Sequence, residues 1–425
     1  MNRYGPDCHE RGIRGYGNPD EGVVIVGIAP GKNEMKIGRP LVGQSGELLD
    51  AVLEAAGWSR DKCYCTNLIC WYNNEPSPSE IDDCSDRLHR EILEAKPKLI
   101  VTLGKLATEH FVKREMGSVR GCPTWNDEFN CWVLPTWHPA TFLHGYDGAI
   151  LDIAKDLSKI VTVRDWPKDI ANFHYDVCQS TDDAQRKLNA LCSRGSFVAI
   201  DVETDNKNVD EIDVFDDRFL CASVSDGDDT ITMPYEVFKK MNFPGANISY
   251  DESQVYTIRV NKVRYTFHNG MFDTQAILKH TGIDIPIVED TMLMSYALDE
   301  RQGTHRLKQL VREYVGAGFY ETEIEPYKKK GMSFAPENVL YRYNAADACY
   351  TARLASVLYP MMIKDNVEHM YKTLLIPAAN RFKYIQLRGV HVDRAKIYKL
   401  GAEWTQRWLE DEQELVDMAT AAGLS

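Results

Sequence analysis

The chain has 425 residues, which is too long for one ordinary domain and predicts about two to four. Its formal charge of −14 argues against a protein that holds nucleic acid by an overall basic surface, although it does not exclude an enzyme whose carboxylates are neutralised by metal ions. We find no apolar run of about 18 residues and no secretory leader, so we expect a cytoplasmic protein without a membrane partner.

The first part of the chain alternates strand-like runs with helical patterns. Strands are expected at residues 23–29, 63–70, 98–104 and 131–137, and helices at residues 45–57 and 79–95. This alternation predicts a mainly parallel sheet with helices on both faces. Such sheets bind ligands at the carboxyl ends of their strands. The segments that follow the strands are 27–34, 66–67, 104–105 and 138–139.

The first of these segments contains a Gly-Pro-Gly turn in VVIVGIAPGKNE, residues 23–34. A glycine turn after a buried strand can cradle a phosphate. The spacing, however, fits neither the dinucleotide-binding nor the Walker motif, and Pro30 removes a backbone N–H. The spacing alone therefore leaves open what this turn binds.

Cysteines are concentrated at the start of the chain. Of the 11 in the sequence, those within the first 131 residues are Cys8, Cys63, Cys65, Cys70, Cys84, Cys122 and Cys131. In a reducing compartment this bias indicates a metal or cluster site more than disulfides.

A lapse of pattern at residues 164–174 predicts a linker. A second unit follows, with a helix at 181–195, a strand at 196–205, a hairpin at 217–235, a strand at 263–269 and helices to residue 360. The remainder, 361–425, is predicted to be helical with one interruption at RGVHVD. We therefore expect domains at residues 1–163, 175–360 and 361–425.

The second unit carries an ordered set of acids. Asp201 and Glu203 are two residues apart, so they lie on one side of a strand. Asp273 follows in HNGMFD, and Tyr343 and Asp347 are spaced to share a helix face. Alone, the D-x-E pattern also fits a solvated strand edge. The whole set favours a phosphodiesterase with two Mg²⁺ or Mn²⁺ ions.

This order of motifs resembles the proofreading exonuclease domain of DNA polymerase I-like (family A) polymerases, over residues 175–360. The resemblance implies a ribonuclease H-like fold and 3′–5′ exonuclease activity on single-stranded DNA ends. It also implies that Asp201, Glu203, Asp273 and Asp347 bind the metal ions and that Tyr343 orients the attacking water.

The last segment resembles the entry into a family A polymerase domain, through LLIPAANRFKYIQLRGVHVDRAKI with Gly389 and Asp393. An ordinary helix–turn–helix fits so short a match as well. The chain ends before any polymerase palm motif, so we expect that it does not polymerise DNA alone. The polymerase module is then expected downstream or on a separate chain.

The first unit resembles the uracil-DNA glycosylase superfamily, and in particular its iron–sulfur family 4, over residues 22–157. The matching segments are the turn at 27–34, GRPLVGQSGELLD, the Thr66–Asn67 pair and WHPA. The resemblance implies a three-layer α/β/α fold whose turn holds a flipped base. The implied pocket residues are Gly27, Ala29, Pro30, Gly31, Glu34, Leu41, Asn67 and His138.

The pocket chemistry fits uracil in part. The Asn67 amide has the donor and acceptor that match uracil O4 and N3–H, and His138 can donate to O2. Glu34 aligns with a family acid that can position water. Ile28 and Leu41, in contrast, replace an acid and a stacking Phe of many members. A turn-capping Asn67, a buried structural His138 and a non-catalytic uracil- or DNA-binding module therefore remain alternatives.

The cysteine pattern also matches the family in part. Cys70 and Cys84 flank WYNNEPSPSEIDD as one pair of cluster ligands does, but the expected N-terminal C-x-x-C is reduced to Cys8 beside His9. A 4Fe–4S cluster would need a fourth ligand from Cys122, Cys131 or His9, and an empty site is the alternative. Together, the two resemblances imply the N-terminal part of a phage-type polymerase that acts in the host cytoplasm.

Overall fold

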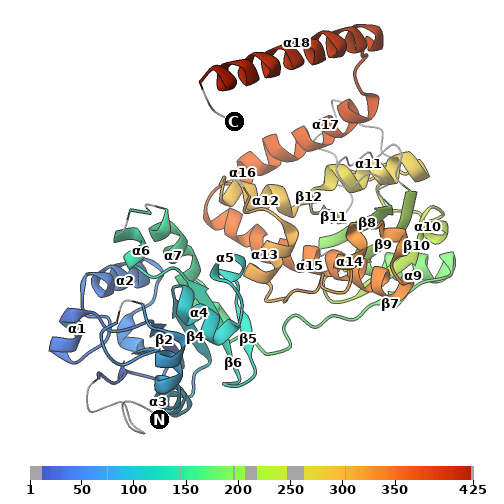
Figure 1. Ribbon diagram of the computed structural model, residues 1–425. Coiled ribbons are helices and arrows are strands. Elements are labelled where there is room, and N and C mark those ends of the chain that lie inside the picture. The colour runs from blue at the N-terminus through green and yellow to red at the C-terminus, as the bar shows by residue number, and fades with distance from the viewer. Residues whose placement is uncertain are drawn as a thin grey trace. The chain divides into compact units, whose positions relative to one another are not determined.

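The computed structural model describes residues 12–73, 75–143, 145–146, 148–194, 197–205, 218–246, 263–301 and 303–422. The chain forms two compact units, Met1–Pro377 and Ala378–Ser425 (Figure 1). The candidate ligands Cys8 and His9 lie outside the described residues. No helix in the described ranges is both long and apolar enough to cross a membrane.

The first sheet has the strand order β1-β3-β2-β4-β6-β5. The strands are β1 (Tyr16–Gly17), β2 (Val23–Gly27), β3 (Cys63–Asn67), β4 (Leu99–Leu103), β5 (Thr124–Asn126) and β6 (Cys131–Thr136). The central β3, β2, β4 and β6 run parallel, and the two edge strands are antiparallel to their neighbours. Every residue of β2 is buried, as expected for a parallel strand covered on both faces. The predicted parallel sheet is confirmed.

Two hydrophobic clusters cover the two faces of this sheet. Val23 and Ile25 belong to one cluster, and Val24 and Val26 to the other. The covering elements are α1 (Lys32–Ile37), α2 (Gln44–Ala55), η2 (Arg60–Lys62), α3 (Pro78–Ala95), α4 (Lys105–Val112), α5 (Met116–Val119), α6 (Ala140–Leu143), α7 (Ala149–Leu157) and α8 (Ile160–Val163). Helices α2 and α7 contribute to the first cluster, and α3 and α4 to the second. The expected α/β/α layering is confirmed.

The second sheet has the order β12-β11-β8-β9-β10-β7. Its strands are β7 (Asp176–Val177), β8 (Phe197–Asp205), β9 (Arg218–Ser225), β10 (Thr230–Pro234), β11 (Arg264–Phe267) and β12 (Glu289–Asp290). Strand β8 pairs with β11 in parallel and with β9 antiparallel. The predicted hairpin is the β9–β10 pair.

The helices of this second region include a long one that packs on β8 and β9. The set is α9 (Thr181–Ser193), α10 (Tyr235–Phe238), α11 (Gly270–Thr281), α12 (Thr291–Leu298), α13 (Leu307–Tyr314), α14 (Glu325–Lys328), η5 (Met332–Phe334), α15 (Glu337–Lys364), α16 (Glu368–Met370) and the π-helical η6 (Tyr371–Leu375). The long helix α15 therefore faces the central strand of the sheet (Figure 1).

The described residues between α8 and β7 form no helix or strand. The carbonyls of Ile170 and Asn172 nevertheless accept hydrogen bonds from Arg353, and that of Ala171 accepts one from Tyr350. The linker is thus anchored to α15.

The helices α17 (Ile376–Arg388) and α18 (Arg394–Ala421) end the chain. They are separated at the predicted interruption, where Gly389 has a φ of 66°. This left-handed conformation favours glycine and ends α17.

Candidate functional site

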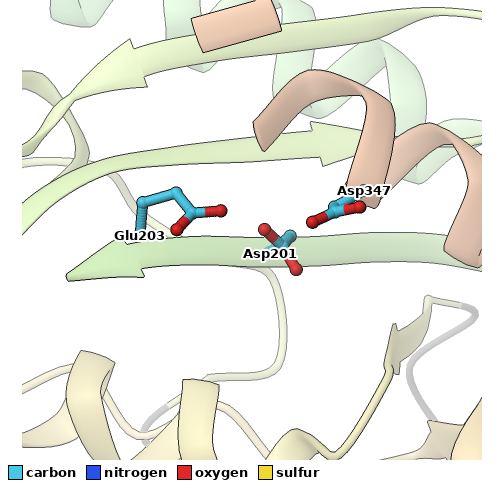
Figure 2. Close-up of side chains that lie close together, drawn as sticks. All are labelled: Asp201, Glu203 and Asp347. Atoms are coloured by element: carbon cyan, nitrogen blue, oxygen red, sulfur yellow. The ribbon is translucent and has the colours of Figure 1, made fainter. Parts of the chain in front are cut away.

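The carboxylates of Asp201, Glu203 and Asp347 form the densest acidic group in the described chain. Asp201 and Glu203 extend from the same side of β8, and α15 presents Asp347 to that side (Figure 2). One carboxylate oxygen from each residue lies within 4.8 Å of the others. Figure 2 shows Asp201 between the other two, with the three carboxylates directed toward one another. The site thus joins segments that are more than 140 positions apart in the sequence. A hydrogen bond from Asn344 to Asp201, residues 143 positions apart, connects the same two segments.

Asp273 lies beside this group. It occupies the first turn of α11, and only 4% of its surface is exposed. Its Oδ1 accepts a hydrogen bond from the backbone N–H of Val202, at 3.1 Å. Because Val202 separates Asp201 from Glu203, the structure brings the fourth predicted acid to the same stretch of β8, although outside the group of three.

Three of the four acids, Asp201, Glu203 and Asp273, are electrostatically unfavourable as they stand. Burial, and then the charge of Asp347, raise the pKa of Asp201 well above its usual range. Burial also raises the pKa of Glu203 and that of Asp273 to about 8 each. Crowded, buried carboxylates of this kind need cations to stay ionised. Hard oxygen ligands in this number suit Mg²⁺ or Mn²⁺, so the residues present fit the implied metal ions.

Two residues that the sequence did not single out contact Asp347. The ammonium of Lys308, near the start of α13, forms an ion pair with its Oδ1. The hydroxyl of Tyr320 donates to the same oxygen at 2.6 Å. The Lys308 Nζ lies 4.6 Å from the ring centroid of Tyr320 and 4.3 Å from that of Tyr343. Lys308 had a weak sequence signal, since it lies in the HRLKQL stretch, and Tyr320 had none.

A third missed residue, Asn344, positions Asp201. Its Nδ2 donates to Asp201 Oδ2 at 2.7 Å, while its Oδ1 accepts from the Ser223 hydroxyl at 2.5 Å. Its neighbour Tyr343 faces the same site, and burial, followed by the charge of Asp347, raises the pKa of this phenol well above its usual range. The Tyr343 hydroxyl therefore remains a proton donor at neutral pH.

The end of β3 and the turn after β2 form the core of the second candidate site. Gly27 and Asn67 are register partners, and a Cβ on Gly27 would lie 2.3 Å from Asn67 Oδ1. Glycine is thus required for the amide to lie over the turn. The buried Arg87 donates to the carbonyls of Asn67 and Leu68 at 2.7 and 2.9 Å and fixes the end of β3. Sequence reasoning did not identify Arg87, although its helical spacing with Glu91 was a signal.

His138 follows β6 at the same end of the sheet. Its Nδ1 accepts a hydrogen bond from the Ala140 N–H at 3.1 Å, so the neutral ring carries its proton on Nε2. Gly104 has a φ of 87°, and a Cβ there would lie 3.2 Å from the His138 Cβ and 3.6 Å from Ile28 Cδ1. Ile28 therefore lies in the neighbourhood of His138.

Two other predicted pocket residues have structural partners. The Glu34 carboxylate accepts the N–H of Gly31 at 2.6 Å and so caps the start of α1. The turn of Ala29, Pro30 and Gly31 leads directly into this cap. Leu41 is 3% exposed and packs in the core with Leu49 and Val52. Glu34 and Leu41 thus both have structural roles, as a helix cap and as a core residue.

The Cys70 and Cys84 side chains lie together, with their sulfur atoms 3.6 Å apart. Both are buried, and the described start of the chain passes alongside, where the Ile13 N–H donates to the Cys70 carbonyl. Cys131 packs in a different hydrophobic cluster. Within the described ranges no group of three or more metal-binding side chains includes this pair, so Cys122 and Cys131 do not complete a site there.

Comparisons with known proteins agree with both regions. Residues 14–159 match the family model of the uracil DNA glycosylase superfamily, and residues 176–363 match that of the 3′–5′ exonuclease. The chain is 37% identical over 144 residues to the type-4 uracil-DNA glycosylase of Saccharolobus solfataricus, covering 31% of this chain and 67% of that protein. The corresponding protein of Thermotoga maritima is 35% identical over 155 residues, covering 35% of this chain and 80% of that protein.

A viral polymerase is also similar. The DNA polymerase of Escherichia phage T5 is 30% identical over 151 residues, which cover 31% of this chain and 18% of the polymerase. The chain thus spans a small part of that relative. It belongs to the uracil-DNA glycosylase superfamily and carries, fused to its glycosylase-family domain, a 3′–5′ exonuclease domain with relatives among family A DNA polymerases.

Proposed function

We propose that this chain is the N-terminal portion of a phage DNA polymerase, in which a metal-dependent exonuclease removes nucleotides from single-stranded 3′ ends of DNA and the glycosylase-family domain reads uracil. The observation that carries the exonuclease assignment is the group of Asp201, Glu203 and Asp347, whose carboxylate oxygens lie within 4.8 Å of one another. The proposed domain limits are residues 1–163, 175–360 and 361–425.

Each residue of the site has a role that follows from its contacts. Asp201, Glu203, Asp273 and Asp347 would hold two Mg²⁺ or Mn²⁺ ions, which supply an activated water and neutralise charge on the phosphate when they are bound. The Tyr343 hydroxyl stays protonated and orients the water by donating to or accepting from it. Asn344 fixes the direction of the Asp201 carboxylate, and the Val202 N–H fixes Asp273.

The exonuclease assignment is tested with the double variant Asp201→Ala/Glu203→Ala. It should lose Mg²⁺-dependent release of 3′ nucleotides from a single-stranded oligonucleotide, because at least two ligands are removed. The matched control is Asp228→Ala/Glu236→Ala, two exposed acids of the same region. Undiminished digestion by the first double variant would contradict the assignment.

A non-catalytic role of the glycosylase-family domain is the second candidate. It is favoured by the structural duties of Glu34 and Leu41 and by Ile28 beside His138. Catalysis is favoured by Asn67 and by the Nε2 proton of His138, which can stabilise charge on a departing uracil by about 3 kcal/mol. Both candidates share uracil recognition by Asn67.

Exonuclease-inactive protein separates the two candidates. A uracil-containing single strand should bind more tightly than its thymine counterpart, and Asn67→Ala should remove this preference. His89→Ala, a change of a half-buried histidine away from the pocket, is the control for His138→Ala in an assay of abasic-site formation. Abasic sites that depend on His138 establish an enzyme, whereas uracil preference without abasic sites establishes a reader. Equal binding of uracil and thymine would contradict both.

We also propose a 4Fe–4S cluster on Cys8, Cys70 and Cys84. The buried sulfur pair of Cys70 and Cys84 supports it. Anaerobically purified protein should be brown, with absorbance near ~400 nm and about four irons per chain, as thiolate-held clusters are. Cys84→Ser should lose the colour while Cys131→Ser should keep it. Colourless, iron-free protein after anaerobic preparation would rule the cluster out.

A further inference from the structure

A short basic segment of the exonuclease domain has an exposed aromatic side chain at its end. It runs from Lys328 to Phe334 and consists of three consecutive lysines, Gly331 and the 3-10 helix η5. The side chains of Lys329 and Lys330 belong to exposed residues, and Phe334 is 71% exposed. We call this segment the basic turn. A phenyl ring so open to solvent is accessible to a ligand.

The basic turn is held against the strand that carries the catalytic acids. The Ser333 N–H donates to Oδ1 of Asp205, two residues beyond Glu203 on β8, at 3.2 Å. Gly331 has a φ of 109°, and a Cβ there would lie 2.9 Å from the same Asp205 oxygen and 3.2 Å from the Phe334 ring. The close approach of the turn to β8 therefore requires glycine at this position.

Hydrophobic contacts hold the other side of the turn. Tyr327, Met332 and Ala335 pack against a cluster that includes Ile324 and Tyr341. These contacts fix the backbone of the turn, and this backbone directs the Phe334 ring into solvent.

The first charge of the turn, that of Lys328, lies near the carboxylate site. The Lys328 Nζ lies 5.6 Å from the ring centroid of Tyr343, the residue that orients water in the proposed reaction. The lysine run therefore begins at the site and continues into solvent toward Lys330.

We infer that the basic turn is the binding site for the single strand upstream of the nucleotide being removed: Lys328, Lys329 and Lys330 contact its phosphates, and Phe334 stacks on one of its bases. Proteins that bind single strands without sequence preference combine a cationic track with aromatic platforms, because every base has a π-face. The turn offers both within seven residues, next to the carboxylates, on a chain that is otherwise acidic. This inference rests on the proposed exonuclease function and adds how the substrate is held.

Steady-state digestion of single-stranded oligonucleotides by the full chain tests it. Phe334→Ala should raise KM about ten-fold, as expected for loss of one base–aromatic stack, with kcat within about two-fold of the parent. Phe334→Trp should restore the parent KM. Phe382→Ala, which removes another exposed phenyl group, is the matched control and should change neither constant.

Two further measurements separate stacking from a general loss of structure. Oligonucleotides with abasic residues two to four positions from the 3′ end should raise the parent's KM but leave that of Phe334→Ala unchanged. Lys329→Ala/Lys330→Ala should reduce the slope of log KM against log salt concentration by about 1.4, from two phosphate contacts to a single strand.

The result that overturns the inference is specific. If Phe334→Ala keeps the parent KM on long strands while Asp201→Ala/Glu203→Ala is inactive, the exonuclease assignment stands and the basic turn has no role in binding. A fall in kcat with unchanged KM for Phe334→Ala also overturns it, because the ring would then shape the carboxylate site and not hold the strand. Inactivity of the parent itself would instead contradict the proposed function.

Discussion

The exonuclease site and the glycosylase-family pocket differ in whether their polar groups have partners within the protein. At the exonuclease site buried acids repel one another, and burial raises the pKa of Glu203 to about 8. In the glycosylase-family pocket Glu34 already caps a helix and the His138 Nδ1 already accepts a backbone N–H. The first site is therefore incomplete without cations, whereas the second is satisfied by its own backbone. The order of the sequence motifs identifies both sites. Only at the exonuclease site does the repulsion between acids also indicate a ligand, namely cations.

The largest expected effect comes from removing one of the strained charges. Asp201→Asn should lower the exonuclease rate by about 10³-fold or more, because a metal ligand is lost. The same change should stabilise the metal-free protein by about 1–2 kcal/mol, since it relieves repulsion in the buried group. Activity assays with Mg²⁺ and thermal unfolding in EDTA measure the two effects, with Asp228→Asn as an exposed control. A lower melting temperature in EDTA would show that the acids are not strained.

The opposite case is Glu313, a buried acid whose charge is compensated. Its Oε1 lies 2.8 Å from Lys159 Nζ and 3.1 Å from Lys155 Nζ. Burial alone raises its pKa, but the two lysines outweigh burial and bring it to about 2. Because the folded pKa lies below the unfolded value of 4.5, the stabilisation is fully present above pH 4.5 and is lost as the pH falls toward 2.

Glu313→Gln should therefore cost about 3 kcal/mol of unfolding free energy at pH 7, and this difference should shrink between pH 4.5 and 2. Denaturant unfolding over that pH range measures it. Glu236→Gln breaks an exposed pair with Lys239, so it should change the stability far less than Glu313→Gln does. A pH-independent difference for Glu313→Gln would mean that the lysines do not lower its pKa.

An intermediate effect is expected for Lys308, which compensates part of the charge at the exonuclease site. Lys308→Met should destabilise the metal-free protein by about 2 kcal/mol, because Asp347 loses its ion-pair partner. Saturating Mg²⁺ should reduce this loss, since the metal ions neutralise the same carboxylates. Melting temperatures with EDTA and with Mg²⁺ measure the change, and Lys372→Met, a partner of Glu368, is the control. An equal loss under both conditions would show that Lys308 and the metal ions act at separate places.

The sequence predicts those elements of the fold whose buried residues form a continuous apolar run. The central strands are apolar runs, and β2 is buried at every position. The edge strand β12 consists of Glu289 and Asp290, which are buried because they receive partners from elsewhere, such as the hydroxyl of Tyr371 on Glu289. No hydrophobic pattern marks such a strand. The short β7 has two exposed residues, so no hydrophobic pattern predicts it either.

The same limit applies to the site residues. Asp201 and Glu203 are predictable because two positions along a strand share a face. Tyr320 and Lys308 reach Asp347 across 27 and 39 positions of sequence, and only the tertiary fold specifies such contacts. The structural duty of Glu34, in contrast, is local, since its partner Gly31 is three residues away and matches helix capping.

The smallest expected effect tests the pocket at Leu41, which replaces a stacking Phe. Leu41→Phe should strengthen binding of a uracil-containing strand several-fold if the ring reaches the pocket, because stacking on a base contributes about 1–3 kcal/mol and overpacking offsets part of it. The residue is 3% exposed within a packed core, so the larger ring should also cost about 1 kcal/mol of stability. Leu49→Phe enlarges a neighbour in the same cluster and should cost stability without changing binding. Fluorescence anisotropy with uracil and thymine strands, on exonuclease-inactive protein, measures the difference. If both variants leave the preference for uracil unchanged, Leu41 belongs to the core alone, and the glycosylase-family domain recognises uracil without a stacking platform at this position.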